Sequence, residues 1–181
     1  MSRITRIVER SQIAEEHSKI FDSITSSRGH VSGPFSVLLN SPEIAGRAAH
    51  LGAYIRFGSI LKNDERELAI ITTAREFDCD YEWSAHLSLA REAGVQKETI
   101  EIVANRGSVE SLSSDEATII NYGRELLRGH NVCDATFQAA KTSFGAQGVT
   151  ELTATIGYYG MLACALNAFQ VEPEPNTPKL P

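Results

Sequence analysis

The feature that most constrains this 181-residue chain is a run of 20 residues without a charged side chain, from Leu152 to Val171. A helix of this length is long enough to cross a lipid bilayer. Polar residues are spread along the run, among them Thr153 and Asn167, and no cations flank it closely, which is atypical of a membrane span. We therefore expect a buried helix at the centre of an all-α protein, and no membrane partner.

Composition and charge narrow the classes of function. Hydrophobic residues make up 42% of the chain and charged residues 22%, so the chain can bury a sizeable core and is not disordered throughout. A net charge of −6, with no cluster of Lys and Arg, argues against a nucleic-acid partner. Three widely spaced cysteines form no CxxC pair, and the N-terminus has no apolar signal region, so we expect a reducing, cytoplasmic location.

Helix-start and helix-stop signals are dense along the chain, whereas the alternation typical of β-hairpins is absent. Ser41-Pro42 starts one helix, Asn63 caps another, and Gly94 and Gly145 are stop signals. The helices expected from these signals span residues 11–26, 42–59, 63–77, 80–93, 97–104, 113–129 and 134–144, followed by the long apolar helix, which Thr150 would cap.

We expect three parts in the chain: a helical N-terminal extension (residues 1–27), a main domain (residues 28–171) and a tail (residues 172–181). The tail carries four of the six prolines and is expected to be extended or disordered. Glu67-Leu68 is matched 84 positions later by Glu151-Leu152, which suggests two related helical halves. The match is short, and Glu-Leu pairs are common in helices.

One helix carries three reactive side chains. On a helix, Cys79, Glu82 and His86 sit at i, i+3 and i+7, so thiol, carboxylate and imidazole share one face. A carboxylate four residues before a histidine can orient the ring, and partial burial can turn the carboxyl group into a proton donor. Such a pair can move protons without a cofactor, although the same spacing also occurs on ordinary solvated helices.

Four motifs together resemble a known family. They are Arg28-Gly-His-Val-Ser-Gly-Pro-Phe35, Leu39-Asn-Ser-Pro42, Arg66-Glu67-Leu68-Ala69-Ile70 and the run from Cys79 to Gly94. From about Arg28 to Phe169, the sequence resembles the carboxymuconolactone decarboxylase family, which also contains the alkylhydroperoxidase D-like proteins. The resemblance implies a compact multi-helix fold and a homo-oligomer, either a trimer or a hexamer.

The two branches of this family differ at the site, and the chain has features of both. Glu67, Cys79 and His86 match the peroxidase-like branch, but Glu82 stands where that branch has its second cysteine. Without a second thiol, Cys79 has no neighbour on its helix for a disulfide cycle. Glu82, His86 and Gly94 all match the decarboxylase branch, so we favour acid/base chemistry.

The resemblance implies a reaction without metal or organic cofactor on a carboxylated lactone or related small ring acid. His86 would carry the proton, Glu82 would be its partner or a second acid, and Glu67 would support them from the preceding helix. Cys79 would line the pocket, or would be an inert buried thiol. Two other functions stay open: a thiol peroxidase that uses Cys79, and a non-catalytic helical oligomer.

Residues around this constellation are candidates for substrate binding. Tyr81 and Trp83 flank Glu82 and could wall a ring pocket, although aromatic residues in such positions often belong to a core. Arg28, in a loop bracketed by glycines, could bind a substrate carboxylate, and Arg56 is a second candidate. No ligand spacing supports a metal site. The Tyr158-Tyr159 pair between two glycines suggests close helix packing rather than a site.

Overall fold

A computed structural model describes residues 2–181, which contain eight α-helices and no β-strand, so the expected all-α fold is confirmed. Two short 3₁₀ turns, Arg10–Gln12 and Glu15–His17, precede the first α-helix. The α-helices are α1 (Ser18–Arg28), α2 (Gly33–Leu38), α3 (Pro42–Phe57), α4 (Asn63–Glu76), α5 (Asp80–Ala93), α6 (Lys97–Ala104), α7 (Ser114–Gly129) and α8 (Asp134–Phe169).

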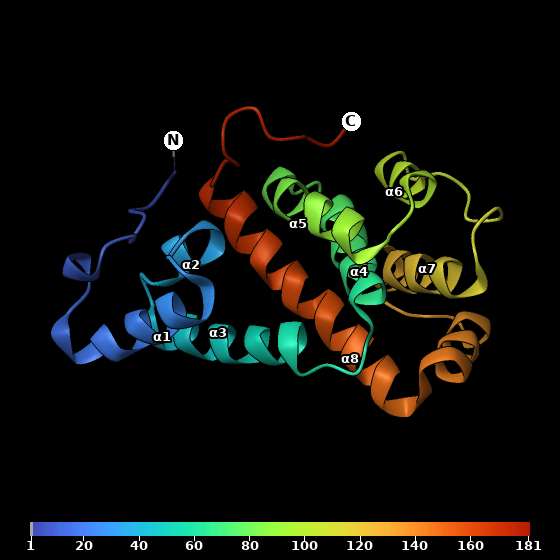
Figure 1. The fold of residues 1–181 in the computed structure, drawn as a ribbon, viewed down its shortest axis with the longest axis horizontal. Coiled ribbons are helices and arrows are strands. Elements are labelled where there is room, and N and C mark those ends of the chain that lie inside the picture. Colours follow the sequence, from blue (N-terminus) through green and yellow to red (C-terminus); the bar gives the residue numbers. More distant parts are fainter. Residues whose placement is uncertain (1) are drawn as a thin grey trace.

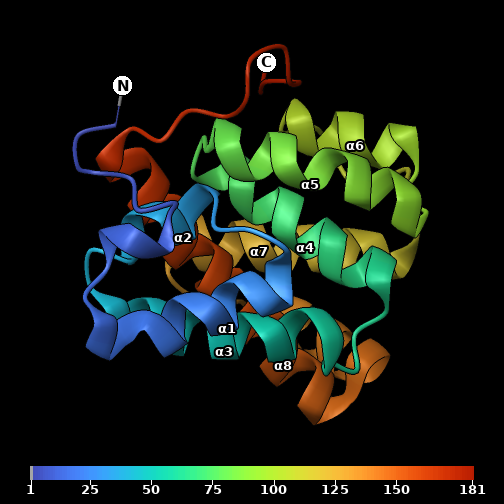
Figure 2. The same cartoon turned by 60° about the vertical axis from the view of Figure 1, so that its left-hand side comes forward.

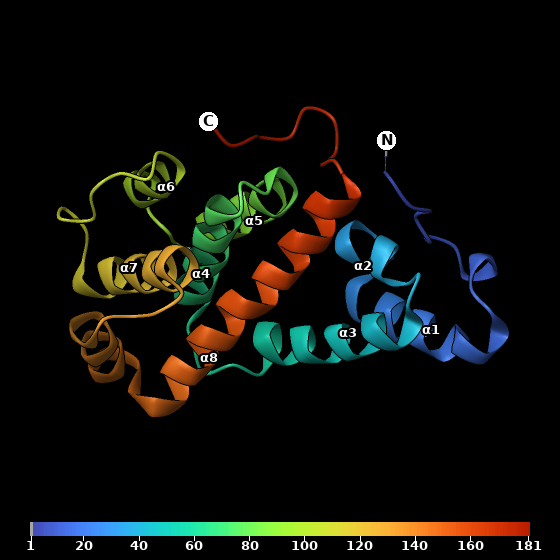
Figure 3. The ribbon, with the colours of Figure 1, turned by 180° about the vertical axis from the view of Figure 1, so that it is seen from behind.

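Helix α8 is the central element. In Figures 1 and 3 it crosses the molecule diagonally, with α1 to α3 on one side and α4 to α7 on the other. Its Leu152 and Ile156 belong to the core that α4 to α7 build, whereas Tyr158, Tyr159 and Leu162 belong to the core of α1 to α3. Among residues 2–181 only this helix is long and apolar enough to span a membrane, and half of its most apolar stretch is buried inside the protein.

Most helix boundaries lie within two residues of where the punctuation signals predict them, although Lys62 rather than Asn63 is the N-cap of α4. Three larger differences occur. The first helix begins at Ser18 rather than after Ser11, because the Gln12 side chain accepts hydrogen bonds from the backbone of Val8 and Glu9 and holds a tight turn there. Helix α2, which is only six residues long, was not expected, and Pro34 in its first turn favours its start at Gly33. Gly145, at φ 68° and ψ 178°, interrupts α8 as expected, but the helix resumes before Thr150, which is not a cap.

Both chain termini are held against the folded helices. The backbone of Arg3 donates to the carbonyl of Phe169 at 2.8 Å, and the backbone of Ile7 donates to that of Ser36 at 2.7 Å. The tail has no helix, and the Leu180 amide donates to the Asp80 carboxylate at 3.0 Å. The N-terminal extension therefore packs onto the same core as α3, and the tail crosses the start of α5.

The connection between α4 and α5 brings these helices together in antiparallel orientation. Asp78 has φ +46°, and the amide of Cys79 donates to the carbonyl of Ala74 at 2.9 Å, so the chain reverses within three residues. Figure 2 shows α4 and α5 running side by side as a result. Gly94, at φ +103°, ends α5 in the left-handed conformation that the sequence predicts.

A buried carboxylate fixes the connection between α3 and α4 to α8. The side chain of Glu151 accepts hydrogen bonds from the Tyr54 hydroxyl (2.8 Å), the Ser59 hydroxyl (2.6 Å), the Ile60 amide (2.8 Å) and the Gln147 amide group (2.8 Å). Burial alone would raise the pKa of this carboxyl group, but the four hydrogen bonds outweigh burial and lower the pKa to about 2. Glu151 is therefore ionised and acts as an anchor between distant segments.

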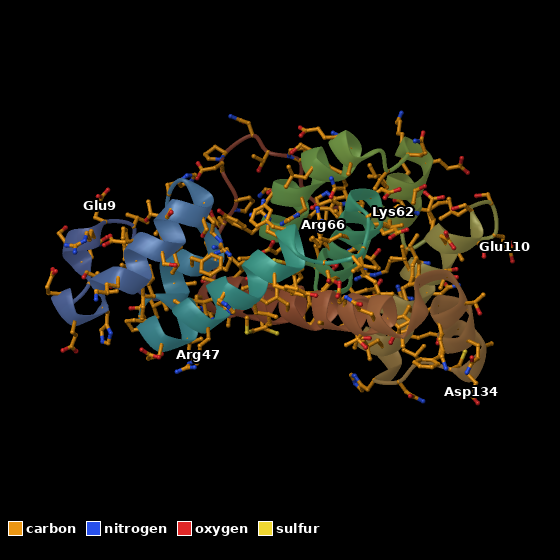
Figure 4. All side chains as sticks on the ribbon, turned by 60° about the horizontal axis from the view of Figure 1, so that its bottom comes forward. Glu9, Arg47, Lys62, Arg66, Glu110 and Asp134 are labelled. Atoms are coloured by element: carbon orange, nitrogen blue, oxygen red, sulfur yellow. The ribbon has the colours of Figure 1, made fainter. Side chains whose placement is uncertain are left out.

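We predict that Glu151→Gln lowers the free energy of unfolding by about 2–4 kcal/mol, because the amide loses charge-assisted bonds and turns a donor toward other donors. Denaturant titration measures this loss. Glu110→Gln is the matched control, since Glu110 is exposed at the edge of the molecule (Figure 4). The Glu151 contribution is complete above the ordinary pKa of about 4.5 and disappears as the pH falls toward 2, so the two variants should converge in acid. Equal stability of both variants at pH 7 would contradict the anchor.

Candidate functional site

Three ionisable side chains meet between α4 and α5. The Nδ1 atom of His86 lies 2.7 Å from Oε2 of Glu67, and its Nε2 atom lies 3.6 Å from Oε2 of Glu82. All three side chains are at most 9% exposed. The first distance is that of a hydrogen bond and the second is slightly too long for one. His86 is thus held by Glu67 on one side and faces Glu82 on the other.

Local structure explains why these groups converge. Glu82 and His86 are four residues apart on α5 and share a face, as the spacing predicts. Glu67 lies on α4, which the tight Asp78 turn folds back against α5. The Nε atom of Arg66, near the centre of the molecule in Figure 4, lies 3.7 Å from Oε1 of Glu67. Glu67 therefore has a cation on one oxygen and an imidazole on the other.

Glu82 is in an environment that favours its protonated form. Burial raises the pKa of Glu82, and His86 and Arg56 offset part of this effect while Glu67 adds to it. The Oε1 atom of Glu82 is buried and has no hydrogen-bond partner among residues 2–181. A buried polar atom without a partner is unusual and destabilising in a folded protein. The hydrogen-bonding capacity of this oxygen is therefore unused within the described residues.

Glu82 and His86 line a cavity of about 210 Å³, which we call the Glu82–His86 cavity. Its walls come from the end of α1, the start of α2, and parts of α3, α5 and α8. The cavity therefore combines side chains that are far apart in the sequence. The residues that give it its chemical character are Arg28, Phe35, Arg56, Tyr81, Glu82, His86, Tyr158 and Tyr159.

Of the aromatic residues expected beside Glu82, Tyr81 lines the cavity and Trp83 does not. Trp83 is 3% exposed and packs in the core with Leu87 and Ile119. The residue that follows Glu82 on a helix points about 100° away, so Trp83 packs in the core that α4 to α7 build rather than at the cavity. Its place in the structure is a core position.

Cys79 does not line the cavity either. Helix α5 begins at Asp80, so Cys79 is the N-cap residue, and its side chain is fully buried among Val37, Ala163 and Leu166. Burial raises the pKa of the Cys79 thiol to about 11, although backbone amides near Glu82 partly offset this. The thiol is therefore protonated at neutral pH, whereas the thiolate is the reactive form. Cys133 and Cys164, the other cysteines, are free and exposed.

Both candidate arginines reach the cavity. Arg28 is the last residue of α1 rather than a loop residue, and its guanidinium lies 4.2 Å from the centre of the Phe35 ring. Arg56 approaches from α3 and acts electrostatically on Glu82. Among residues 2–181, neither arginine forms a salt bridge with a carboxylate. The cavity is thus lined by two guanidinium groups in addition to Glu82 and His86.

Tyr158 and Tyr159, which the sequence pattern assigned to helix packing, also lie at the cavity. The Tyr159 ring lies edge-on to His86, with ring centres 5.0 Å apart, and Tyr158 lies edge-on to Tyr159 at 5.3 Å. Both tyrosines line the cavity. The sequence contained a signal for this position, because a tyrosine in an uncharged buried helix needs a hydrogen-bond partner or a polar cavity for its hydroxyl group.

Among residues 2–181, no group of three or more His, Cys, Asp or Glu side chains is arranged to hold a metal ion. The Glu67–His86–Glu82 arrangement is instead suited to holding and moving a proton, since each group can exchange one with its neighbour.

Comparison with known proteins places this site in a family context. Residues 42–116 match the sequence model of the carboxymuconolactone decarboxylase family. No curated protein matches the chain. The matched residues include Glu67, Cys79, Glu82 and His86.

Solved structures share the fold at low sequence identity. A peroxidase-related protein from Ralstonia eutropha JMP134, described as an alkylhydroperoxidase AhpD core, has a TM-score of 0.77 at 17% identity, over 96% of this chain and 93% of that one. A peroxidase-related protein from Silicibacter sp. TM1040 gives 0.73 at 16%, over 91% and 88%.

The debrominase Bmp8, solved with 2,3,4-tribromopyrrole, gives a TM-score of 0.76 at 13% identity, over 97% of this chain and 94% of that one. At such identities these likenesses show the fold alone. The resemblance recognised from the sequence motifs is thus confirmed by the match of residues 42–116 to the carboxymuconolactone decarboxylase family, and the chain has the helical fold of these solved structures.

Proposed function

We propose that the protein is a cofactor-independent lyase or isomerase that moves protons on a small carboxylated ring substrate. The observation that carries this proposal is the position of His86, bonded to Glu67 and facing Glu82 at the wall of a cavity. A histidine held in one orientation by a buried carboxylate is suited to proton transfer. The match of residues 42–116 to the carboxymuconolactone decarboxylase family supports the proposal.

Decarboxylation is the reaction of this class that the resemblance favours. The bond between a ring carbon and its carboxylate breaks, the electron pair moves through a conjugated double bond into the ring carbonyl, and carbon dioxide leaves. A proton then returns to the ring, so the reaction consumes one proton and needs no oxidant or reductant. The protein has to position the ring and supply that proton.

The side chains divide this work. Glu67 accepts the hydrogen bond from Nδ1 of His86 and fixes the tautomer that leaves Nε2 directed toward Glu82. Glu82, whose pKa burial raises, is the second acid at the cavity wall. Arg28 and Arg56 provide the positive charge that a carboxylated substrate needs in a protein of net charge −6.

A thiol peroxidase is the second candidate, and the peroxidase-related structural neighbours are what favour it. That chemistry would require Cys79 to leave its buried position and to ionise despite a pKa of about 11. It would also need a partner other than Glu82 for disulfide formation. The acid/base mechanism does not require Cys79 to move or to ionise.

We predict that His86→Ala or Glu82→Gln lowers turnover of a carboxylated lactone by about 100-fold or more, because each removes a proton-transfer group. Cys79→Ser is the comparison variant and should keep appreciable activity, since the buried thiol does not face the cavity. Steady-state assays of lactone decarboxylation and of peroxide reduction measure both reactions. If Cys79→Ser abolishes peroxide-dependent turnover while His86→Ala leaves lactone turnover unchanged, the assignment is wrong.

A pH dependence follows from the raised pKa of Glu82. If protonated Glu82 is the acid, activity should fall as the pH rises through that pKa, and this alkaline limb should be missing from the residual activity of Glu82→Gln. Stability provides a second measurement. Because the folded state holds the Glu82 proton more tightly than the unfolded state, the free energy of unfolding relative to Glu82→Gln should decrease as the pH rises above about 4.5. A rise in this free-energy difference above pH 4.5 would contradict a raised pKa of Glu82.

We further propose a cytoplasmic location, in keeping with three free thiols, and a homo-oligomer formed through α3 and α8. The part of α8 that follows Gly145 carries one charged residue, Glu151. Glu151 is buried, so the face of this part that is exposed to solvent is uncharged. Phe57, Tyr54 and Leu51 of α3 are 70%, 47% and 45% exposed beside it. A second copy is the occupant we favour, because an uncharged face of small residues fits the same face of an identical helix. Exposed α8 residues on the side next to α3 include Ala146, Gln147, Thr150 and Ala154, and Gly157 and Met161 are exposed further along the helix.

We predict that Ala154→Arg reduces the oligomer to smaller species in sedimentation experiments at micromolar concentration, because it places a charge in this uncharged face. Ala139→Arg is the matched control, since Ala139 is exposed on the first part of α8, outside the face. A stable monomer of the unmodified protein would contradict the proposal, as would an unchanged oligomer in Ala154→Arg. Binding of the unmodified monomer to phosphatidylcholine vesicles would identify lipid as the occupant instead.

A further inference from the structure

The tip of Tyr158 occupies a space that the absence of a side chain at Gly52 creates. A Cβ atom added to Gly52 would lie 2.1 Å from the Tyr158 hydroxyl oxygen and 3.2 Å from Nη2 of Arg28. Contacts of 2.1 Å do not occur between such atoms, so any larger residue at position 52 would displace the Tyr158 phenol. Gly52 therefore allows the Tyr158 hydroxyl to sit beside the Arg28 guanidinium at the cavity wall.

Arg28 is held in place by neutral groups. Its Nη2 donates to the carbonyl of Ala49 at 3.3 Å, its Nη1 donates to the Ser27 hydroxyl at 2.7 Å, and its plane lies over Phe35. A guanidinium carries five N–H donors, so several remain for a ligand. The cation is thus oriented in advance without a carboxylate that would neutralise it.

Tyr158 is a neutral hydrogen-bond donor at this position. Burial raises the pKa of its phenol to about 12, and the charge of Arg28 offsets part of that effect. Within residues 2–181, no acceptor receives a hydrogen bond from the Tyr158 hydroxyl. The phenol proton and the spare Arg28 protons can therefore meet on one bound anion.

We propose that Tyr158 is a substrate-positioning residue whose hydroxyl group, together with Arg28, binds a carboxylate of a ring acid. The inference deepens the proposed function and rests on it for the identity of the reacting groups. Tyr158 is linked through the Tyr159 ring to His86 by two edge-on contacts, of 5.3 and 5.0 Å between ring centres. The carboxylate subsite is therefore at a fixed distance from the proton carrier.

The size of the cavity suits a ligand with one small ring. Its volume of about 210 Å³ is only modestly larger than the roughly 150 Å³ cavity that accepts benzene in another protein. Such a site discriminates strongly through polar pairing, because a ligand that lacks the matching group leaves buried donors without partners. We expect a carboxylate to bind much better than an amide of the same shape.

Benzoate and benzamide are suitable probes, since they share a ring and differ in charge, and neither is decarboxylated or otherwise consumed by proton transfer. Isothermal titration calorimetry measures their affinity for the unmodified protein and for variants. Tyr158→Phe should weaken benzoate binding by about tenfold and change benzamide binding by less than about twofold. Tyr122→Phe is the matched control and should change neither, because the Tyr122 hydroxyl is bonded to Thr153 at 2.8 Å, outside the cavity.

Gly52→Ala provides a second variant that leaves the phenol intact and forces it to move. Weaker benzoate binding in both variants, with unchanged unfolding midpoints, supports the subsite. Unchanged benzoate affinity in Tyr158→Phe, or equal affinity of the unmodified protein for benzoate and benzamide, overturns it. Because benzoate is not consumed, this outcome is independent of whether His86 and Glu82 catalyse a reaction.

Discussion

The hydrogen bond between Glu67 and His86 is the interaction on which the site depends. It joins α4 to α5 at 2.7 Å, in a region where both side chains are almost fully buried. A buried carboxylate or imidazole alone would be strongly destabilising, and pairing removes much of that penalty. Because Nδ1 is engaged by Glu67, Nε2 is left for Glu82. The same contact therefore stabilises the helix pair and determines which nitrogen can exchange a proton.

Helix α8 gives this pair an enclosing wall. Its apolar residues join the two cores, and its adjacent tyrosines bring aromatic surface and hydroxyl groups to the cavity. Glu151 is the one acidic residue in the second part of the helix, and it is used entirely for anchoring the connection between α3 and α4. That anchor positions the end of α3, from which Arg56 reaches the cavity. The part of α8 that follows Gly145 thus contributes to core packing, to the cavity wall and to an exposed uncharged face.

Local patterns predicted most helix boundaries and the Glu82/His86 pair, because capping, glycine stops and i, i+4 spacing are properties of neighbouring residues. Contacts between helices were not accessible in the same way. Glu67 was assigned a supporting role through the family resemblance alone. Trp83 and Cys79 were placed near the site because they are close in sequence, but rotation around α5 and the start of that helix at Asp80 put both in cores. The convergence of Arg28, Arg56 and Tyr158 depends on α1, α3 and α8 packing together.

Position 82 determines which chemistry this scaffold can support. In the peroxidase-like pattern that the chain resembles, a second thiol would stand here, four residues before the histidine. A carboxyl group in its place retains proton exchange with His86 and loses the possibility of a disulfide on the helix. Burial reinforces this difference, since it raises both the pKa of Glu82, which favours the acid form, and the pKa of Cys79, which disfavours the thiolate. The cavity is therefore lined by a carboxyl group and an imidazole and not by a thiol.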